Sequence, residues 1–147
     1  MFKTFIYAYI ASFSFSIIFN VDKKTSYLAA FGGALGWLCF SASLNTFNLY
    51  GLSYFLAAVV ISFYAEIMAR IKKMPVTAFL TTALIPLVPG GELYETMLSF
   101  IKKDHLGALD GFVSAIMATG ALALGIIVVS TIIKSYFLIQ GRVKPIS

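Results

Sequence analysis

Few side chains in this sequence have the type and spacing that enzymatic chemistry requires. The chain contains one histidine, His105, and one cysteine, Cys39. His105 lies in a polar stretch beside Lys103 and Asp104, and no Ser/His/Asp set can be assembled around it. The sequence also lacks an H-E-x-x-H motif and a cysteine pair, which are common sources of zinc ligands. We therefore expect no catalytic residues, no metal site and no cofactor, and hence a protein that is not an enzyme.

Two carboxylates beside apolar segments remain as candidates for chemistry. Glu66 lies about one turn from the basic end of an apolar segment, where a carboxylate can relay protons or bind an ammonium group. Its alternative role is to pair with Arg70, four residues later on the same helix face. Asp110 opens another apolar segment, where a carboxylate also complements a helix N-terminus. Glu66 and Asp110 are thus candidate residues of an ionisable pathway, each with a structural alternative.

The stretch ALIPLVPGGELYE, residues 83–95, places helix breakers at the end of an apolar run. Pro86 and Pro89 each lack a backbone N–H, and Gly90 and Gly91 permit unusual backbone angles. Many transporters use a broken helix to expose backbone dipoles to a solute within the membrane. The alternative is an ordinary helix that ends at a proline and a glycine cap. We take these four residues as a candidate solute path, with the ordinary helix end as an equal alternative.

The composition indicates that lipid surrounds much of this chain. Of the 147 residues, 60% are hydrophobic and 12% are charged, and the mean hydropathy is +0.92. A soluble domain of this length needs more charged surface, so we expect an all-α integral membrane protein with a single transmembrane domain, 1–147. The net charge of +5 arises from short basic clusters between apolar runs, a positive-inside pattern. The lipid bilayer is therefore a predicted partner, and nucleic acid is not.

Charged and polar residues divide the chain into five apolar segments. They cover approximately residues 2–19, 26–44, 49–69, 76–90 and 111–133. The first is preceded by only one lysine and lacks an A-x-A cleavage site, so we expect a retained span rather than a signal peptide. The fourth has 15 residues, fewer than the roughly 17 to 25 that a bilayer requires. We expect about five transmembrane helices, of which the fourth is short and broken.

Residues 92–103, between the last two segments, have the periodicity of a short amphipathic helix. Its apolar positions are Tyr94, Met97, Leu98 and Ile101. Glu92 and Glu95 lie away from them, and we expect these carboxylates to form a solvated face or to line the mouth of a pore. Such a helix is predicted to lie in the membrane interface or under the bundle.

Small residues recur at every fourth position in two of the segments. Gly32 and Gly36 form one pair, and its surroundings lack the Lys and Ser/Thr of a phosphate-binding loop. The second stripe consists of Gly107, Gly111, Ala115, Thr119 and Ala123. In membranes such stripes allow two helix backbones to approach closely, so we expect both to be helix contacts.

The stretch KMPVTAFLTTALIPLVPGGELY, residues 73–94, resembles the signature of the threonine/serine exporter family. The matching residues are Pro75, Pro86, Leu87, Val88, Pro89, Gly90 and Tyr94. Over nearly its full length, the chain resembles the small subunit of the split, two-chain form of this family. The resemblance implies a larger membrane subunit as partner and a location in the bacterial cytoplasmic membrane. It also implies export of a small polar solute, either threonine and serine or dicarboxylates such as succinate.

These observations together predict half of a secondary exporter for small polar metabolites. The rival hypothesis is an accessory or scaffold subunit that stabilises a membrane partner without transporting a solute. The two hypotheses differ in whether point changes in the broken segment stop solute flux while the complex still assembles.

The distribution of basic residues predicts the orientation of the chain. If all five segments cross, one side carries eight Lys and Arg residues: Lys23, Lys24, Arg70, Lys72, Lys73, Lys134, Arg142 and Lys144. The other side carries only Lys3, Lys102 and Lys103. Because basic residues are retained in the cytoplasm, the N-terminus is predicted outside and the C-terminus inside.

Labelling of single cysteines in whole cells tests this orientation. With Cys39 replaced, a cysteine at position 105 should react with a membrane-impermeant thiol reagent, and a cysteine at position 73 should not. Labelling at position 73 alone would reverse the topology.

Overall fold

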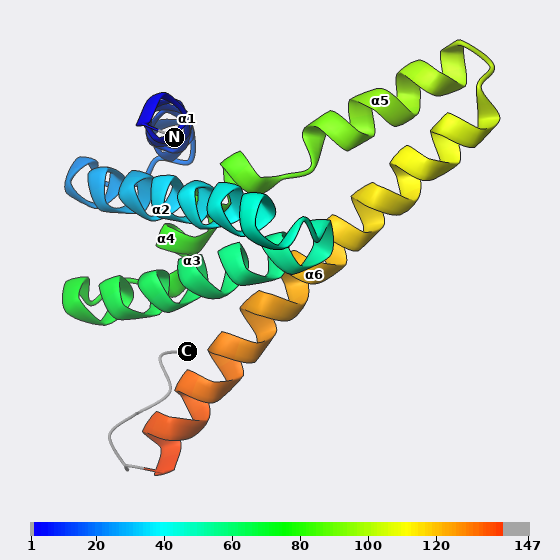
Figure 1. Ribbon diagram of the computed structural model, residues 1–147. Helices are drawn as coiled ribbons and strands as arrows, with labels where there is room; N and C mark the ends of the chain where they lie inside the picture. The colour runs from blue at the N-terminus through cyan, green and yellow to red at the C-terminus, as the bar shows by residue number, and fades with distance from the viewer. Residues whose placement is uncertain (1, 140–147) are drawn as a thin grey trace.

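The computed structural model describes residues 2–139 of the chain, and these residues form helices and short connections without a strand. The elements are α1 (Phe2–Ile18), α2 (Lys23–Phe47), α3 (Tyr50–Lys72), α4 (Val76–Leu84), the 3₁₀ turn η1 (Ile85–Leu87), α5 (Gly90–Ile101) and α6 (His105–Ile139). Figure 1 shows α1 to α4 gathered in one bundle, and α6, whose first part lies beside α5 away from the bundle, continues past α3. The predicted all-α class is confirmed.

Three helices in the described residues are long and apolar enough to cross a membrane. They are Thr25–Phe47, Tyr50–Lys72 and His105–Phe137. The pair Val76–Leu87 and Gly90–Ile101, bent by 46°, adds a fourth span if it is counted as one. The first apolar segment is a shorter helix, α1, of 17 residues. Length and composition thus support three to four of the five predicted spans.

Helices α3 and α6 run in the same direction, which constrains the path of the chain between them. Gly125 packs against Ala58, and a Cβ at Gly125 would lie 2.7 Å from the Ala58 Cβ. Twelve residues further along both helices, the Arg70 guanidinium lies 3.7 Å from the centre of the Phe137 ring. Because the two helices run in the same direction, the intervening α4–η1–α5 segment must return along the bundle. This geometry favours an irregular crossing over a re-entrant hairpin.

Small residues bring α2 close to α3. A Cβ on Gly32 would lie 2.7 Å from Cδ1 of Tyr64, and a Cβ on Gly36 would overlap the side chain of Ile61. Alanines accompany this interface, since Ala65 of α3 and Ala29 of α2 share one core cluster and are fully buried. The predicted close contact at Gly32 and Gly36 is therefore confirmed, because any larger residue there would separate the two backbones.

The small-residue stripe of α6 was only partly predicted. Thr119 and Ala123 are exposed, contrary to the expected four-residue repeat. The buried positions of α6 are instead Ala108, Ala115, Ala118, Leu122, Gly125 and Val129. An α-helix has 3.6 residues per turn, so the residues of one contact face are spaced alternately by three and four. A strict four-residue repeat gradually rotates away from that face.

A helical arm, which we define as α5 and residues 105–114 of α6, projects from the bundle (Figure 1). Its two helices pack closely, because Gly107 and Gly111 face Ser99 and Thr96 of α5. Helix α6 begins at His105, well before the predicted start at residue 111. Asp110 therefore lies in the second turn of α6 and does not open it, which corrects the predicted position at the helix N-terminus.

The contact at Gly125 generates a prediction about stability. Gly125→Ala should lower the free energy of unfolding by about 1–3 kcal/mol, because its Cβ would meet Ala58 and the Phe55 carbonyl, at 2.7 and 2.9 Å. Gly120→Ala is the matched control on the same helix, since its Cβ would meet nothing within 4 Å. Thermal unfolding of both variants in detergent measures the difference, and equal stabilities would contradict this packing.

Candidate functional site

The predicted broken helix is present and lies around Pro86. Helix α4 ends at Leu84, a 3₁₀ turn covers Ile85–Leu87, and α5 starts at Gly90 after Pro89. The 3₁₀ turn is closed by a 3.2 Å hydrogen bond that the Val88 N–H donates to the Ile85 carbonyl. The two halves of the segment meet at 46°. The prolines thus produce a change of direction inside the segment, since α5 continues for three further turns.

The two glycines after the break have a different role from the predicted one. Gly90 and Gly91 form the first residues of α5, and neither has a positive φ. A Cβ at either position would meet nothing within 4 Å. Their freedom to adopt unusual backbone angles is therefore not used here, and the prolines alone account for the bend.

The break lies halfway along the bundle. A Cβ at Gly36 would touch both Ile61, the central residue of α3, and Leu87, at 3.4 Å from its Cδ1. One turn away, Gly32 lies between Tyr64 and Ala83. Helix α3 has the length of a membrane span, so its central residue marks the level of the bilayer midplane. Within the irregular segment, Leu87 and Pro89 are buried, residues 84–86 are half-buried and Val88 is exposed, so protein covers part of the backbone at the depth where lipid could not satisfy it.

A second polar feature lies where the arm meets the N-terminal end of α3. The Tyr50 hydroxyl donates a hydrogen bond of 2.5 Å to Oε1 of Glu92. The Tyr54 hydroxyl donates a second hydrogen bond, of 3.2 Å, to the same oxygen. Two tyrosines of α3 therefore hold the first turn of α5 in place through one carboxylate.

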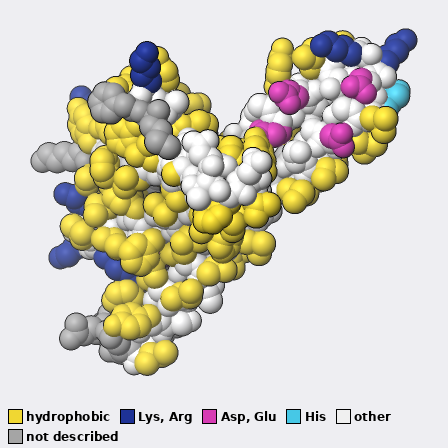
Figure 2. Space-filling view, in the orientation of Figure 1, with side chains coloured by type: hydrophobic (Ala, Val, Ile, Leu, Met, Phe, Trp, Pro, Cys, Tyr) yellow, Lys and Arg dark blue, Asp and Glu magenta, His cyan; other side chains and the backbone are white. Residues whose placement is uncertain are grey.

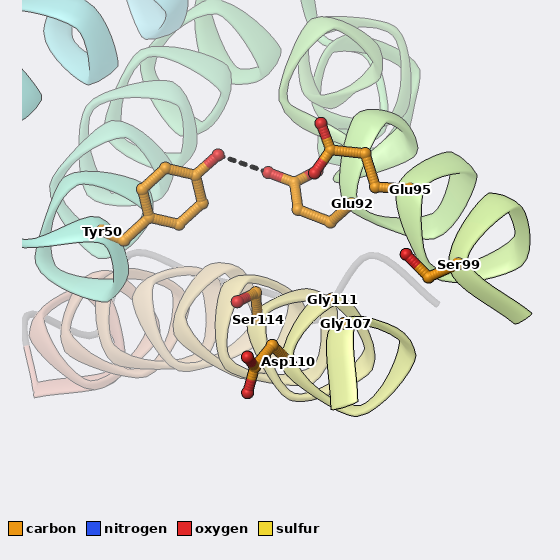
Figure 3. Close-up of a pocket in the computed structure, with 8 residues that line it drawn as sticks. All are labelled: Tyr50, Glu92, Glu95, Ser99, Gly107, Asp110, Gly111 and Ser114. Carbon is orange, nitrogen blue, oxygen red and sulfur yellow. Dashed lines mark hydrogen bonds between the residues drawn. The ribbon is translucent and has the colours of Figure 1, made fainter. Parts of the chain in front are cut away.

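These groups open onto a cleft of about 410 Å³ between α3, α5 and α6. Figure 3 shows its lining, which consists of Tyr50, Glu92, Glu95, Ser99, Gly107, Asp110, Gly111 and Ser114. Three of these eight residues are carboxylates and none is basic. Figure 2 shows the acidic side chains gathered on the arm. The acidic cleft, as we call this feature, therefore attracts cationic groups and repels anions.

The amphipathic helix α5 has the opposite orientation to that of a helix on a soluble bundle. Its apolar residues Tyr94, Met97 and Ile101 are 67%, 67% and 77% exposed. Its polar residues Glu92 and Ser99 are half-buried and face the cleft. Glu92 and Glu95 both line the cleft, which agrees with the predicted polar opening, and Glu95 is in addition exposed, which agrees with the predicted solvated face.

Glu66 lies apart from the acidic cleft, near the opposite end of α3. Its side chain is buried, and Oε2 accepts a hydrogen bond of 3.3 Å from Nη2 of Arg70. The Arg70 guanidinium also lies over the ring of Phe137 on α6. This arrangement matches the structural alternative of an i, i+4 pair, although the carboxylate is buried within the bundle and does not extend to the interface. The structure therefore does not bring Glu66 and Asp110 together.

Comparison with known proteins assigns the chain to a family. A family model described as threonine/serine exporter, ThrE, matches residues 4–132. The chain belongs to the threonine/serine exporter family. An uncharacterised protein of Haemophilus influenzae is 26% identical to it over 129 residues, which cover 82% of this chain and 43% of that protein. No solved structure matches this member of the threonine/serine exporter family.

Sequence reasoning missed several polar residues of this exporter-family chain. Tyr50 and Tyr54 carry no motif, and only the fold brings them to Glu92. Ser12 and Trp37 each bury a polar atom, Oγ and Nε1, without a hydrogen-bond partner among the described residues. A serine in the middle of an apolar helix was the only available signal, and such serines usually bond their own backbone.

The contact between Tyr50 and Glu92 predicts a measurable coupling. A double-mutant cycle of Tyr50→Phe and Glu92→Gln should give a coupling of about 1 kcal/mol in unfolding free energy, because each change removes the same charged hydrogen bond. Tyr94→Phe is the control, since Tyr94 is 67% exposed on the same helix. A coupling of zero would show that the carboxylate does not hold the arm to α3.

Proposed function

We propose that this chain is the small subunit of a two-component secondary exporter for small polar metabolites. The broken helix at the midplane carries this proposal. Secondary transporters commonly bind their solute near the midplane, where discontinuous helices present backbone groups to it. In this proposal the solute passes along the break at Pro86 and Pro89 and near the start of α5 at Gly90 and Gly91.

The general architecture of secondary transporters supports a partner subunit. The chain covers 43% of the Haemophilus influenzae relative, so more than half of that protein has no counterpart here. Secondary transporters often place the solute site between two repeats or halves. We propose that a larger membrane protein of the same family supplies the other half.

The charge of the acidic cleft supports one of the two predicted solute classes. Threonine and serine are zwitterions without net charge, and Glu92, Glu95 and Asp110 can attract their ammonium group at the mouth of the path. Succinate carries two negative charges, and the same three carboxylates would repel it. We therefore propose threonine-like or serine-like amino acids first and dicarboxylates second.

The two ionisable candidates lie at opposite ends of the proposed path. Asp110 lines its outer mouth together with Glu92 and Glu95. Glu66 lies near the cytoplasmic end, where its pair with Arg70 supports a structural role. We further propose the orientation that the basic residues predict, with the N-terminus outside the bacterial cytoplasmic membrane and the end of α6 at the cytoplasmic side. No enzymatic activity is proposed.

Reconstitution in liposomes tests the proposal. The purified chain is reconstituted alone or with the larger membrane protein that co-purifies with it. The liposomes are then loaded with labelled threonine, serine or succinate. We expect efflux only when both chains are present, and faster efflux of the two amino acids than of succinate. Robust efflux from this chain by itself would contradict the two-component arrangement.

A proline variant separates transport from assembly. Pro86→Ala restores a backbone N–H and should straighten the segment, which displaces the break and lowers efflux by about tenfold or more. Pro75→Ala is the matched control, because Pro75 is an exposed residue that precedes α4 outside the break. Full efflux from a correctly assembled Pro86→Ala complex would favour the scaffold hypothesis.

A further inference from the structure

Ser12 is a buried hydroxyl without a hydrogen-bond partner. It lies in the middle of α1, is 0% exposed, and its Oγ bonds to no group among the described residues. Its neighbours on α1 behave differently, because Ser14 Oγ donates to the Ile10 carbonyl at 2.9 Å and Ser16 Oγ donates to the Phe13 carbonyl at 2.6 Å. A buried hydroxyl that makes no hydrogen bond costs about 1–3 kcal/mol. This cost indicates that another group completes the site.

The Ser12 side chain lies at the break in the fourth segment. A Cβ on Gly33 would clash with Ser12 Oγ and would lie 3.2 Å from the carbonyl oxygen of Ala83. The hydroxyl of α1 and the carbonyl of α4 therefore face the same point of α2, where only a glycine fits. Three elements that are distant in sequence thus meet around two oxygen atoms.

The Ala83 carbonyl belongs to the C-terminal end of the half-helix α4. In an α-helix the N–H of residue 86 would donate to Thr82 and the N–H of Leu87 to Ala83, and in a 3₁₀ turn the N–H of residue 86 would donate to Ala83. Pro86 has no N–H and can serve neither carbonyl. The end of a helix also carries a partial negative charge on its free carbonyls. The break is therefore rich in acceptors and poor in donors.

Among the described side chains, none that is basic lies beside these acceptors. Arg70 and Lys72 lie in the last turn of α3, and Lys102 and Lys103 lie at the tip of the arm. Among the elements around the break, α4 contains no basic residue, and Lys23 is at the start of α2. A small cation would supply the missing positive charge, and neutral hydroxyl and carbonyl oxygens are suitable ligands for it.

We propose that a small monovalent cation or an ammonium group binds at the break, between Ser12 Oγ and the Ala83 carbonyl oxygen. The proposal rests on the proposed function for its role, because the same break lies on the solute path. The bound group is then either an inorganic ion that is coupled to transport or the amino group of the solute. Its binding can be measured without any transport, so the two proposals fail independently.

The only tryptophan of the chain, Trp37, provides the probe. It lies one turn after Gly33 on α2, and its indole nitrogen is buried. The full-length chain, purified in lipid nanodiscs, is titrated with sodium, potassium or ammonium chloride against choline chloride at constant ionic strength. We expect a saturable change in fluorescence with at least one small cation and none with choline. Ser12→Ala should weaken this response about tenfold or more, because it removes one ligand.

Ser14→Ala is the matched control, since Ser14 is an exposed serine on the same helix. It should leave the titration unchanged. A response to sodium or potassium identifies an inorganic ion, and a response to ammonium alone identifies the amino group of a solute; both uphold the site. The absence of a saturable response in the wild-type chain overturns the proposal, as does an equal response in a folded Ser12→Ala variant. The wild-type titration remains decisive if Ser12→Ala does not fold.

Discussion

The structure depends on one constraint, which is that backbone groups in a membrane must find partners within the protein. Helices α2, α3 and α6 meet this constraint by continuous hydrogen bonding over their whole length. The fourth segment cannot, because Pro86 interrupts its ladder at the midplane. The bundle accommodates the interruption by packing α2 against it, with Gly32, Gly33 and Gly36 allowing close approach. The prolines therefore create the break, and the glycines, which lie far from them in the sequence, let α2 pack closely against it.

The arrangement of polar and apolar surfaces follows from the same solvent. In the arm, Glu92 faces α3 (Figure 3), Glu95 and Asp110 line the cleft and remain exposed, and the large apolar side chains of α5 point outward. A soluble helical hairpin would have the reverse arrangement, because water would cover its outer face. Tyr50 and Tyr54 stabilise this inverted arrangement by donating to Glu92 from α3. The three helices α3, α5 and α6 thus form the walls of this cleft together.

Much of the fold could be predicted from the sequence, because the signals for it are local. Apolar length located α2 and α3, the doubled proline located the break, and Gly32 and Gly36 located a helix contact. The errors have one source, namely that a sequence does not state what a helix face contacts. The expected position of Glu92 on a solvated face and the strict four-residue stripe on α6 both failed for this reason. The role of Ser12 could not be predicted for the same reason, since only the fold shows that its hydroxyl and the Ala83 carbonyl approach the same point at Gly33.

The length of α6 has a mechanical consequence. This single helix of 35 residues is about 50 Å long, and it forms one side of the acidic cleft before it packs along α3 to Phe137. Such a helix behaves as a stiff rod, and it packs tightly on α3 at Gly125. A tilt of the arm about the Gly125 contact would displace the opposite end of α6, where Phe137 packs against Arg70. A displacement at one end of α6 is thereby geometrically tied to a displacement at the other.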